Sequence, residues 1–542
     1  MRALGDTIAD CLLRAAERGE GEYVFHLEEG TVRMSCGELA ERAVRAAGQL
    51  AARGVAPGDR VGVFGANRPE WVVAAFATWL AGAVLVPVPI PLRLRSPDLI
   101  AERTRRILEA VDCNRVLVDP NLASLLPEGV AHPWDSDAAA GAERLSLPRT
   151  EDPAVIQMTS GSTAEPKGAL ITHAAVRAQL EFLRRLWETD DGARTSLNWT
   201  PYFHDMGLFS NGVISAPVWG TTTHHLPTER FASDPGEWLR LLASTETTVT
   251  GAPSSSYGAA LRAVARRGER IDLRHVEVAI FGAEGVDPTV AERLLQGSDG
   301  VRFRSEALGS SYGLAEAVLA VTTTPVGAGL WMERVSVEAL SEGRAEPAGD
   351  GPARVLTSCG THGSSTELRI MGPDGELPER HIGEVQIRGP SLMQGYVGRG
   401  APDPFVDGWL RTGDLGYLAE GELFMTGRLK DMVIVLGQNY YPEDFEWAAG
   451  AVDGVRPGRC AAFSNDVTEQ MVLLVEPSDE RDLTGLARAV RKSVATAVGV
   501  LPGEVVVVPR GTVEKTTSGK LRRSSMRADY SDGRIEVLGR SG

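Results

Sequence analysis

A run of small and hydroxylated residues has the composition of a phosphate-binding loop. It follows the apolar stretch AVIQM and reads Thr159-Ser160-Gly161-Ser162-Thr163-Ala164-Glu165-Pro166-Lys167-Gly168. Small residues let backbone N–H groups approach phosphate oxygens, the hydroxyls add donors, and Lys167 supplies positive charge. A Walker A loop is excluded because Gly168, and not Ser or Thr, follows the lysine. Taken alone, the run is also compatible with an ordinary Ser/Gly turn.

Two further segments contain groups that suit the rest of a nucleotide. A second cationic loop lies far away in the sequence and reads Glu514-Lys515-Thr516-Thr517-Ser518-Gly519-Lys520-Leu521-Arg522-Arg523. In the segment RTGD, the carboxylate of Asp414 can accept hydrogen bonds from a pair of sugar hydroxyls. A solvated basic tail is the alternative for the second loop. Together with the first loop, these segments predict a site for a nucleotide and its phosphates.

The histidines and cysteines do not have the spacing of a metal centre. His224 and His225 are adjacent without a third ligand, so we interpret them as surface or pocket-lining residues. His173 is expected to cap the helix that follows the first loop. No CxxC pair occurs, which predicts reduced, structural thiols for all the cysteines, namely Cys11, Cys36, Cys113, Cys359 and Cys460.

A serine hydrolase is the alternative from another enzyme class. The segment GSSYG at 309–313 fits the GxSxG pattern, which places a nucleophilic serine, here Ser311, on a sharp turn between a strand and a helix. The mechanism also needs a later acid and a histidine, and the candidates His362 and His381 lie in loop-like and hairpin-like stretches. This interpretation leaves the other segments unexplained.

The elements that must position these loops follow an α/β pattern. The sequence predicts a helix over 38–53 that ends before Gly54, a strand over 61–64, and a helix whose first turn contains Pro69. The runs AVIQMTS, TTVTGAP and VEVAIFGAE are rich in β-branched residues and end in small ones, as buried parallel strands do. The chemistry is therefore expected at the carboxyl edge of a parallel sheet.

The segment from Trp71 to Leu92 carries no charge and is long enough to span a bilayer. Its composition argues against that. Gly82 divides an Ala-rich half from a strand-like half, and prolines would break the last third of any spanning helix. We therefore predict a buried helix, a turn and a strand.

The pattern changes in the last third of the chain. It weakens over 327–355, where Gly, Pro and acidic residues indicate an insertion that should lie at the surface. The segments STELRIMGPDGE, GEVQIRG and WLRTGDLGYLAEGELFMTG then predict β-hairpins. From Asp431 onward, alternating helices and strands predict a small α+β domain, with a boundary near 428–431.

Composition limits the function classes. The chain of 542 residues is long enough for three or four units, and 43% hydrophobic with 24% charged residues indicates a packed, soluble protein. The formal net charge of −16 disfavours a nucleic-acid or anionic-membrane binder. The N-terminal stretch has charges inside its apolar part, unlike a secretory signal, so the cytoplasm is the expected location.

Six motifs occur in the order of a known superfamily. They are TSGSTAEPKG, FGAEG at 281–285, SYGLAE at 311–316, RTGDLG at 411–416, GRLKD at 427–431 and KTTSGKLRR at 515–523. Over nearly its whole length the chain resembles adenylate-forming enzymes, the superfamily of acyl-CoA synthetases, luciferases and nonribosomal-peptide adenylation domains. WTPYFHDMGL at 199–208 and GRLKDMVIVLGQNYYPEDFE at 427–446 are most similar to the fatty acyl-AMP ligases.

The resemblance implies a reaction in which a carboxylate attacks the α-phosphate of ATP and pyrophosphate leaves. Lys520 would bridge the two anions, and Mg²⁺ with the first loop would hold the β- and γ-phosphates. His204, with Asp205 orienting the loop, would position the carboxylate. The other matched residues would bind Mg²⁺ (Glu316), the ribose (Asp414, Arg428) and the adenine (Gly282, Ala283, Glu284, Tyr312, Gly313), and Lys430 would be the hinge. The retained Lys520, Glu316 and Asp414 argue against a nonenzymatic scaffold.

The implied fold is α/β, with a large N-terminal adenylating domain at 1–429 and a small, mobile α+β domain at 430–542. The N-terminal domain would contain parallel sheets, a β-rich subdomain and the insertion at about 327–355. Departures from the family pattern, at Phe209 and in the segment with Ser254 and Ser255, together with Trp219, predict a shorter or more polar acyl pocket.

The acceptor implied by the resemblance is the phosphopantetheine thiol of an acyl carrier protein that acts in trans, in polyketide, nonribosomal-peptide or lipid biosynthesis. Nothing after Arg523 resembles a pantetheine-attachment segment. The alternative is an acyl-CoA ligase. The segment VIVLGQNYYPED lacks the Lys-rich pattern that is common in CoA ligases, and the insertion resembles one associated with carrier-protein transfer.

Overall fold

The computed structural model confirms the predicted α/β class. It describes residues 4–90, 97–134, 145–159, 166–187, 194–398, 400–431, 433–435, 438–465, 470–479, 481–498, 500–515 and 521–542. The chain packs as two compact units. The first comprises residues 1–330, 360–367 and 388–405, and the second comprises 331–359, 368–387 and 406–542. The predicted domain boundary at 429/430 lies inside the second unit, and a hinge there remains a prediction.

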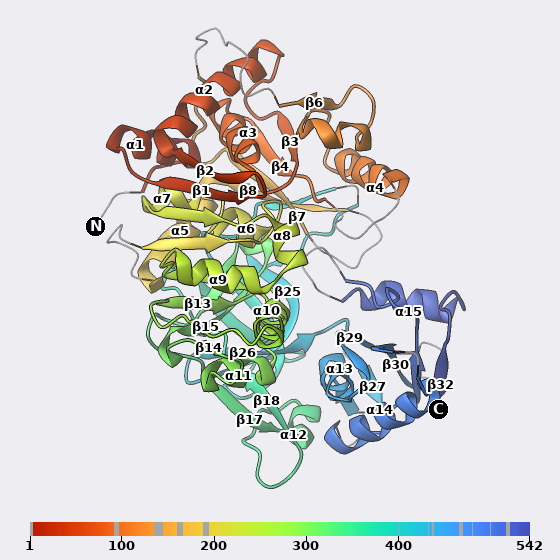
Figure 1. Ribbon diagram of the computed structural model, residues 1–542. Coiled ribbons are helices and arrows are strands. Elements are labelled where there is room, and N and C mark those ends of the chain that lie inside the picture. Colours follow the sequence, from red (N-terminus) through yellow and green to blue (C-terminus); the bar gives the residue numbers. More distant parts are fainter. Residues whose placement is uncertain are drawn as a thin grey trace. The chain divides into compact units, whose positions relative to one another are not determined.

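The larger sheet of the first unit has a parallel centre (Figure 1). From β1 to β15 along this sheet, the neighbouring strands pair in parallel. This confirms the strands predicted from TTVTGAP and VEVAIFGAE. The spatial order is β19 (Thr361–His362), β16 (Ala320–Thr323), β15 (Leu308–Gly313), β13 (Val278–Phe281), β11 (Val249–Ala252), β9 (Thr195–Asn198), β10 (Thr222–His225), β1 (Glu22–Leu27) and β2 (Gly30–Ser35).

The smaller sheet of the first unit supports the candidate phosphate loop. Its spatial order is β23 (Gly395–Val397), β8 (Gly168–Thr172), β7 (Pro153–Met158), β4 (Val84–Pro87), β3 (Arg60–Phe64), β5 (Val116–Val118) and β6 (Ala131–Pro133). The uncharged segment forms buried helix α3 (Pro69–Leu80), a turn at Gly82 with φ of +71°, and β4, as predicted. Among the described residues, no helix is long and apolar enough to cross a membrane.

Helices pack against both sheets of this unit. At α2, Ser35 and Glu38 form a capping box, and Gly54 follows the helix with φ of +80°, which suits glycine. The helices are α1 (Ile8–Arg18), α2 (Cys36–Ala52), α4 (Pro97–Ala110), α5 (His173–Trp187), α6 (Asp205–Phe209), α7 (Ser215–Trp219), α8 (Thr228–Ser233), α9 (Gly236–Ser244), α10 (Ser254–Arg266) and α11 (Pro288–Gln296). All five cysteines of the chain are buried thiols outside any disulfide, as predicted.

His173 caps a different helix from the one predicted. It is the first residue of α5, but its Nδ1 accepts the N–H of Ile8, the first residue of α1, at 3.3 Å. Burial lowers the pKa of His173 to about 4, so the ring is neutral and Nδ1 can act as an acceptor. The sequence could not reveal this contact because it joins residues far apart in the chain.

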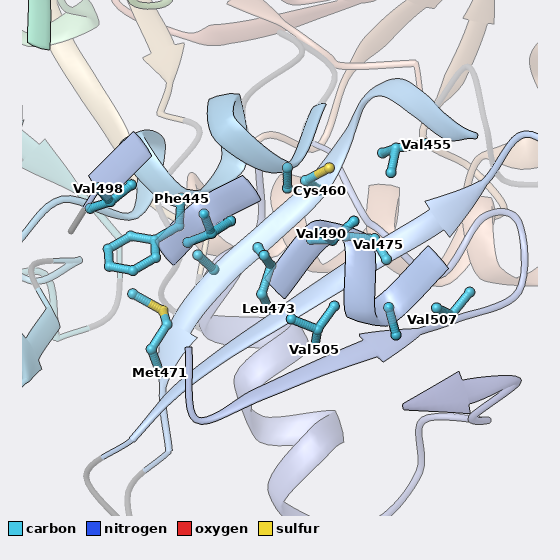
Figure 2. Close-up of a cluster of buried hydrophobic side chains, with 14 of the residues drawn as sticks. Phe445, Val455, Cys460, Met471, Leu473, Val475, Val490, Val498, Val505 and Val507 are labelled. Carbon is cyan, nitrogen blue, oxygen red and sulfur yellow. The ribbon is translucent and has the colours of Figure 1, made fainter. Parts of the chain in front are cut away.

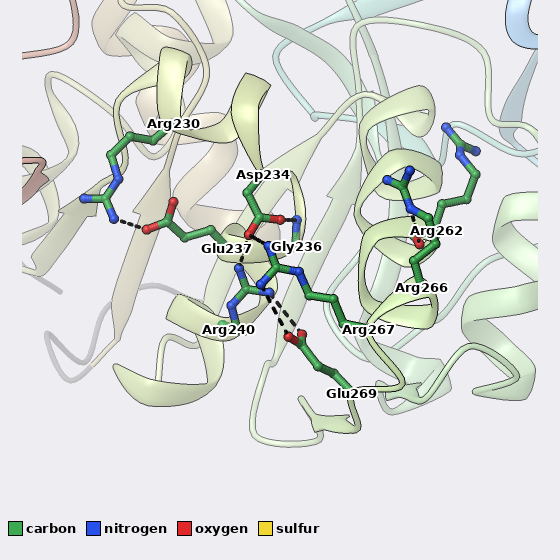
Figure 3. A network of polar contacts seen from close by, with 9 residues as sticks. All are labelled: Arg230, Asp234, Gly236, Glu237, Arg240, Arg262, Arg266, Arg267 and Glu269. Atoms are coloured by element: carbon green, nitrogen blue, oxygen red, sulfur yellow. Dashed lines mark hydrogen bonds and ion pairs between the residues drawn. The ribbon is translucent and has the colours of Figure 1, made fainter.

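A chain of aromatic rings and a network of ion pairs fix the spacing of α8, α9 and α10. Ring centroids lie 3.5 Å apart for Trp199 and Phe231, 4.8 Å for Trp238 and Tyr257, and 4.5 Å for Tyr257 and Phe281. Figure 3 shows the ion pairs, in which Asp234 binds both Arg240 and Arg267, and Glu269 also binds Arg240. The ends of β9 and β13, which lead to candidate site loops, are therefore held at a fixed separation.

The second unit contains a β-rich part, and one prediction about this part is wrong. Residues of the insertion were expected at the surface, but Val335, Leu340 and Ala345 are buried in a cluster with Tyr417 and Phe424. These apolar residues lie on either side of a turn. Their spacing in the sequence therefore does not reveal that they share one buried face. The elements are β17 (Met332–Ser336), α12 (Val337–Ser341), β18 (Ala353–Thr357), β20 (Glu367–Gly372), β21 (Gly375–Glu376), β22 (Gly383–Arg388), β24 (Phe405–Val406), β25 (Trp409–Ala419) and β26 (Glu422–Arg428).

The C-terminal part of the second unit has the predicted α+β pattern. Figure 2 shows its core, where Phe445 and Val490 from the helices pack on Leu473 and Val505 from the strands. The elements are β27 (Val433–Val435), β28 (Gln438–Tyr440), α13 (Pro442–Gly450), β29 (Val455–Ser464), β30 (Met471–Pro477), α14 (Leu483–Val498), β31 (Glu504–Val507), α15 (Arg523–Ser531) and β32 (Gly539–Ser541).

Candidate active site

The candidate phosphate loop joins two antiparallel strands. The N–H of Thr159 donates to the carbonyl of Lys167 at 3.2 Å, which closes the neck of the loop between β7 and β8. Ser160, Gly161, Ser162 and Thr163 lie outside the described residues. The helix that was predicted after the loop is α5, which begins at His173, and β8 lies between the loop and this helix.

The candidate Mg²⁺ ligand lies close to the neck of this loop. Glu316 belongs to a single turn of 3-10 helix at Ala315–Ala317, and its backbone carbonyl accepts the N–H of Met393 at 2.8 Å. Its carboxylate accepts the hydroxyl of Tyr396 at 2.5 Å, and the ammonium group of Lys167 lies 3.5 Å from the centroid of the same ring. A single carboxylate next to a phosphate site suits Mg²⁺, which binds proteins through one or two carboxylates plus phosphate oxygens.

The loop that carries His204 is held by two buried amides that the sequence analysis missed. Asn67 donates to the carbonyl of Thr200 at 2.9 Å and accepts the N–H of Tyr202 at 3.0 Å. Gln157, on β7, donates to the carbonyl of Phe203 at 2.8 Å. The sequence did contain a signal for Gln157, because it is a polar residue inside the apolar run AVIQM.

His204 itself lies at the N-terminal end of α6, next to Asp205, which was predicted to orient the loop. Its Nδ1 lies 2.9 Å from Oδ1 of Asp205, and the same oxygen accepts the N–H of Met206 at 2.7 Å. Asp205 therefore fixes both the imidazole ring and the first turn of the helix. This geometry suits a ring that positions a carboxylate, which remains the predicted role of His204.

The adjacent histidines were predicted to be surface or pocket-lining residues, and their burial excludes the surface position. His224 and His225 are buried on β10, and Nδ1 of His225 lies 2.6 Å from the hydroxyl of Tyr202. Burial lowers the pKa of His224 to about 4 and that of His225 to about 3, so both rings stay neutral. Alternation along the strand does not apply here because this sheet is covered on both faces.

The residues predicted to flank the adenine come together at the ends of adjacent strands. Gly282, Ala283 and Glu284 follow β13, while Tyr312 and Gly313 end the neighbouring strand β15. Ala283 has a φ of +68°, a left-handed conformation that turns the chain sharply after the strand. The carboxylate of Glu284 accepts the N–H of Ser255 at the start of α10. The sheet therefore assembles these residues as expected for its carboxyl edge.

The candidate acyl-pocket residues are mostly interior. Phe209 and Trp219 are buried, Ser255 is exposed, and buried Ser254 accepts the N–H of Asp287 at 2.9 Å. Their role in limiting an acyl chain remains a prediction.

In the second unit, the two candidate ribose ligands form an ion pair. Nε of Arg428 lies 2.9 Å from Oδ1 of Asp414, whose side chain is only 8% exposed. Antiparallel pairing of β25 with β26 places these two residues opposite each other. Burial and the nearby Arg428 lower the pKa of Lys430, the candidate hinge residue.

The stem of the second cationic loop is described, although Lys520 lies outside the described residues. Lys515 and Leu521 form an isolated β-bridge. Beyond the stem, Arg523 makes a bidentate contact with Glu446 at 2.8 and 2.7 Å and binds Asp431 at 3.1 Å. Arg523 therefore ties the chain that follows the stem to α13 and to Asp431.

The geometry of Ser311 contradicts the hydrolase alternative. Ser311 lies within β15, and its hydroxyl donates to the carbonyl of Thr322 at 2.8 Å. A nucleophile elbow instead needs an exposed serine on a turn between a strand and a helix.

Comparisons with known proteins identify the family to which the chain belongs. A family described as AMP-binding enzyme matches residues 12–397. The chain is 30% identical to long-chain-fatty-acid–AMP ligase FadD32 of Mycolicibacterium smegmatis, covering 89% of this chain and 86% of the relative. It is 30% identical to 4-hydroxyphenylalkanoate adenylyltransferase of Mycobacterium marinum, covering 90% and 84%. A solved structure from studies of fatty acyl-adenylate ligases of E. coli and L. pneumophila matches with a TM-score of 0.90 at 28% identity, covering 97% and 98%.

Proposed function

The chain belongs to the AMP-binding enzyme family and is an adenylate-forming ligase, and we propose that it converts a fatty acid and ATP into fatty acyl-AMP and pyrophosphate. The observation that carries the reaction type is the arrangement at the neck of the first loop. Lys167 and Glu316 contact the same tyrosine there, and β7 connects this neck to the His204 loop through Gln157. The names of the relatives support a fatty acid as the substrate class.

The reaction brings two anions together, so the protein must supply positive charge and positioning. A carboxylate oxygen attacks the α-phosphorus, the bond from phosphorus to the bridging oxygen breaks, and pyrophosphate leaves with the electron pair. In our proposal, Lys167 and the first loop neutralise the β- and γ-phosphates, Lys520 bridges the carboxylate and the α-phosphate, and His204 positions the carboxylate. When bound, Mg²⁺ would add positive charge at the leaving group, and Glu316 would hold it.

The remaining matched residues would hold the nucleoside. Asp414 would accept both ribose hydroxyls and Arg428 would lie beside the ribose, while Gly282 to Glu284 with Tyr312 would enclose the adenine. The ion pair of Asp414 with Arg428 supports this assignment because it places the two candidate ribose ligands next to each other.

We propose that the acyl group then passes to the phosphopantetheine thiol of a carrier protein acting in trans. The sulfur attacks the acyl carbon, AMP leaves, and the thiol proton passes to solvent. A rotation of residues 430–542 about Lys430 would exchange the groups needed for the two half-reactions. Free CoA is the alternative acceptor.

Pyrophosphate release with ATP, Mg²⁺ and a panel of acids tests the proposal. The panel contains fatty acids of graded length, hydroxylated fatty acids and 4-hydroxyphenylalkanoic acids, and products are identified by mass spectrometry with and without CoA. We expect acyl-AMP that persists in the presence of CoA. Rapid conversion to acyl-CoA would show that CoA, and not a carrier protein, is the acceptor. A preference for the aromatic acids would show that the substrate is an aromatic acid and not a fatty acid. Absence of pyrophosphate with every acid would contradict the proposed reaction.

A further inference from the structure

We propose that Tyr396 is a positioning residue that sets the places of two opposite charges in the ATP site, the Lys167 ammonium group and the Glu316 carboxylate. The inference rests on the proposed function, because those two residues are assigned to the phosphates and to Mg²⁺ there. Tyr396 itself belongs to none of the six motifs, and its proposed role comes from its contacts alone.

The backbone of Tyr396 is fixed against the neck of the phosphate loop. β23 pairs antiparallel with β8, which places Tyr396 opposite Ala169 and Val397 opposite Gly168. A Cβ on Gly398 would lie 3.1 Å from the carbonyl oxygen of Pro166, so this strand passes very close to the loop. Position 396 is therefore tied to the residues next to Lys167, and a movement of one would be transmitted to the other.

The ammonium group of Lys167 lies over the ring of Tyr396. The distance from Nζ to the ring centroid is 3.5 Å, well within the range of a cation–π interaction. A flexible lysine has many rotamers in solution, and ordering it on a ring reduces the entropy that binding an anion would otherwise cost. The aromatic face thus holds the charge at the loop before a phosphate arrives.

The hydroxyl group of the same side chain holds Glu316. It donates to Oε1 at 2.5 Å, a short hydrogen bond of the kind formed with a charged acceptor. The backbone of the same segment adds a second tie, because the N–H of Met393 donates to the carbonyl of Glu316 at 2.8 Å. The hydroxyl of Tyr396 therefore orients the carboxylate while the N–H of Met393 fixes the backbone of Glu316, as supporting residues commonly orient a metal ligand.

The two contacts use different parts of one side chain, so they can be removed separately. Tyr396→Phe removes the hydroxyl group and leaves a ring beneath Lys167. Tyr396→Leu removes both contacts and keeps an apolar side chain at the position. The first change should affect the dependence on Mg²⁺, and the second should also weaken phosphate binding.

The test measures ATP binding to the full chain by calorimetry, with Mg²⁺ varied and also with Mg²⁺ removed by a chelator. For Tyr396→Phe we expect the Mg²⁺ concentration that gives half of the maximal affinity to rise about tenfold, with little change in affinity when Mg²⁺ is absent. For Tyr396→Leu we expect a further loss of about tenfold that persists without Mg²⁺.

Tyr417→Phe is the matched control. The hydroxyl of Tyr417 also donates to a carboxylate, that of Glu333, but in the β-rich part of the second unit. It should leave both ATP affinity and its Mg²⁺ dependence unchanged. If Tyr396 had a purely structural role, Tyr396→Phe and Tyr396→Leu would both lower thermal stability and would reduce ATP binding to the same extent with and without Mg²⁺.

Two results would overturn the inference. One is an unchanged Mg²⁺ dependence in Tyr396→Phe, and the other is an equal, Mg²⁺-independent loss in both variants. Failure of the proposed function is seen separately, since it means that the parent protein binds ATP but forms no acyl-AMP with any acid of the panel.

Discussion

At the scale of single residues, Gln157 links the strand before the phosphate loop to the loop that presents His204. Replacing it with Leu removes the N–H that the carbonyl of Phe203 accepts at 2.8 Å. Because this frees the His204 loop without touching the nucleotide residues, we expect the KM for the acid to rise about tenfold while ATP affinity stays within about twofold. Initial rates of pyrophosphate release over a range of acid concentrations measure this.

Gln179→Leu provides the control for this change. Gln179 is another fully buried glutamine of the first unit, and its amide makes no hydrogen bond within the described part of the chain. It should leave the KM for the acid unchanged. Equal effects of the two substitutions would mean that Gln157 acts through general stability and not through the loop.

Lys520 is the residue on which the proposed chemistry depends most. For Lys520→Ala we expect acyl-AMP formation to fall by about two to three orders of magnitude, because the charge that bridges the two anions is lost. ATP binding should largely survive, since other residues hold the triphosphate and nucleoside. Lys492→Ala, at an exposed position on α14, removes the same charge elsewhere and should have no effect. Full activity of Lys520→Ala would remove this lysine from the mechanism.

At the scale of elements, the contact between α1 and α5 predicts a specific sensitivity to acid. Burial lowers the pKa of His173 from 6.5 to about 4, so the neutral ring favours the folded state. Because the pKa is lower in the folded state, the stabilisation that the neutral ring provides is complete above pH 6.5 and is lost as the pH falls toward 4. Between about pH 7.5 and pH 5, we expect this group alone to remove about 2 kcal/mol from the free energy of unfolding.

His173→Asn tests this assignment. The amide oxygen of Asn can accept the N–H of Ile8, but the side chain does not titrate. Thermal unfolding of both proteins at the two pH values should show a smaller acid loss for the variant. An identical pH dependence would show that protonation of His173 does not contribute to acid sensitivity.

The elements also show what a sequence can and cannot predict. Strands such as β11 and β13 were predictable because their β-branched runs and small terminal residues are local properties. The phosphate loop could be recognised from its composition. The strand β8 was missed because Gly168 to Thr172 forms a strand by pairing with β7 on one side and with β23 on the other. Non-local pairing of this kind leaves little signal in the segment itself.

The same reason explains the residues missed at the site. Tyr396 gains its importance from Lys167 and Glu316, which are distant in the sequence, and Asn67 gains its importance from Thr200 and Tyr202. Each is an unremarkable residue in its own segment. The buried face of the insertion was misjudged similarly, because its apolar residues pack on β25 and β26.

At the scale of the whole molecule, our proposal gives the two half-reactions different arrangements of the chain around Lys430. Proline at this position would fix φ near −65° and restrict the backbone rotation on which a change of arrangement depends. For Lys430→Pro we expect acyl-AMP formation to stay within about threefold of the parent, while acyl transfer to a carrier protein falls about a hundredfold. Single-turnover measurements of each half-reaction distinguish the two effects.

Lys430→Ala separates the backbone effect from the loss of the charge. Burial and Arg428 lower the pKa of Lys430, so its ammonium group is less strongly favoured here than in water. Alanine leaves φ free, and both half-reactions should then proceed at near-parental rates. If alanine and proline impair transfer equally, the lysine side chain acts directly in the second half-reaction. If proline impairs neither, residues 430–542 do not have to turn about this position for transfer to occur.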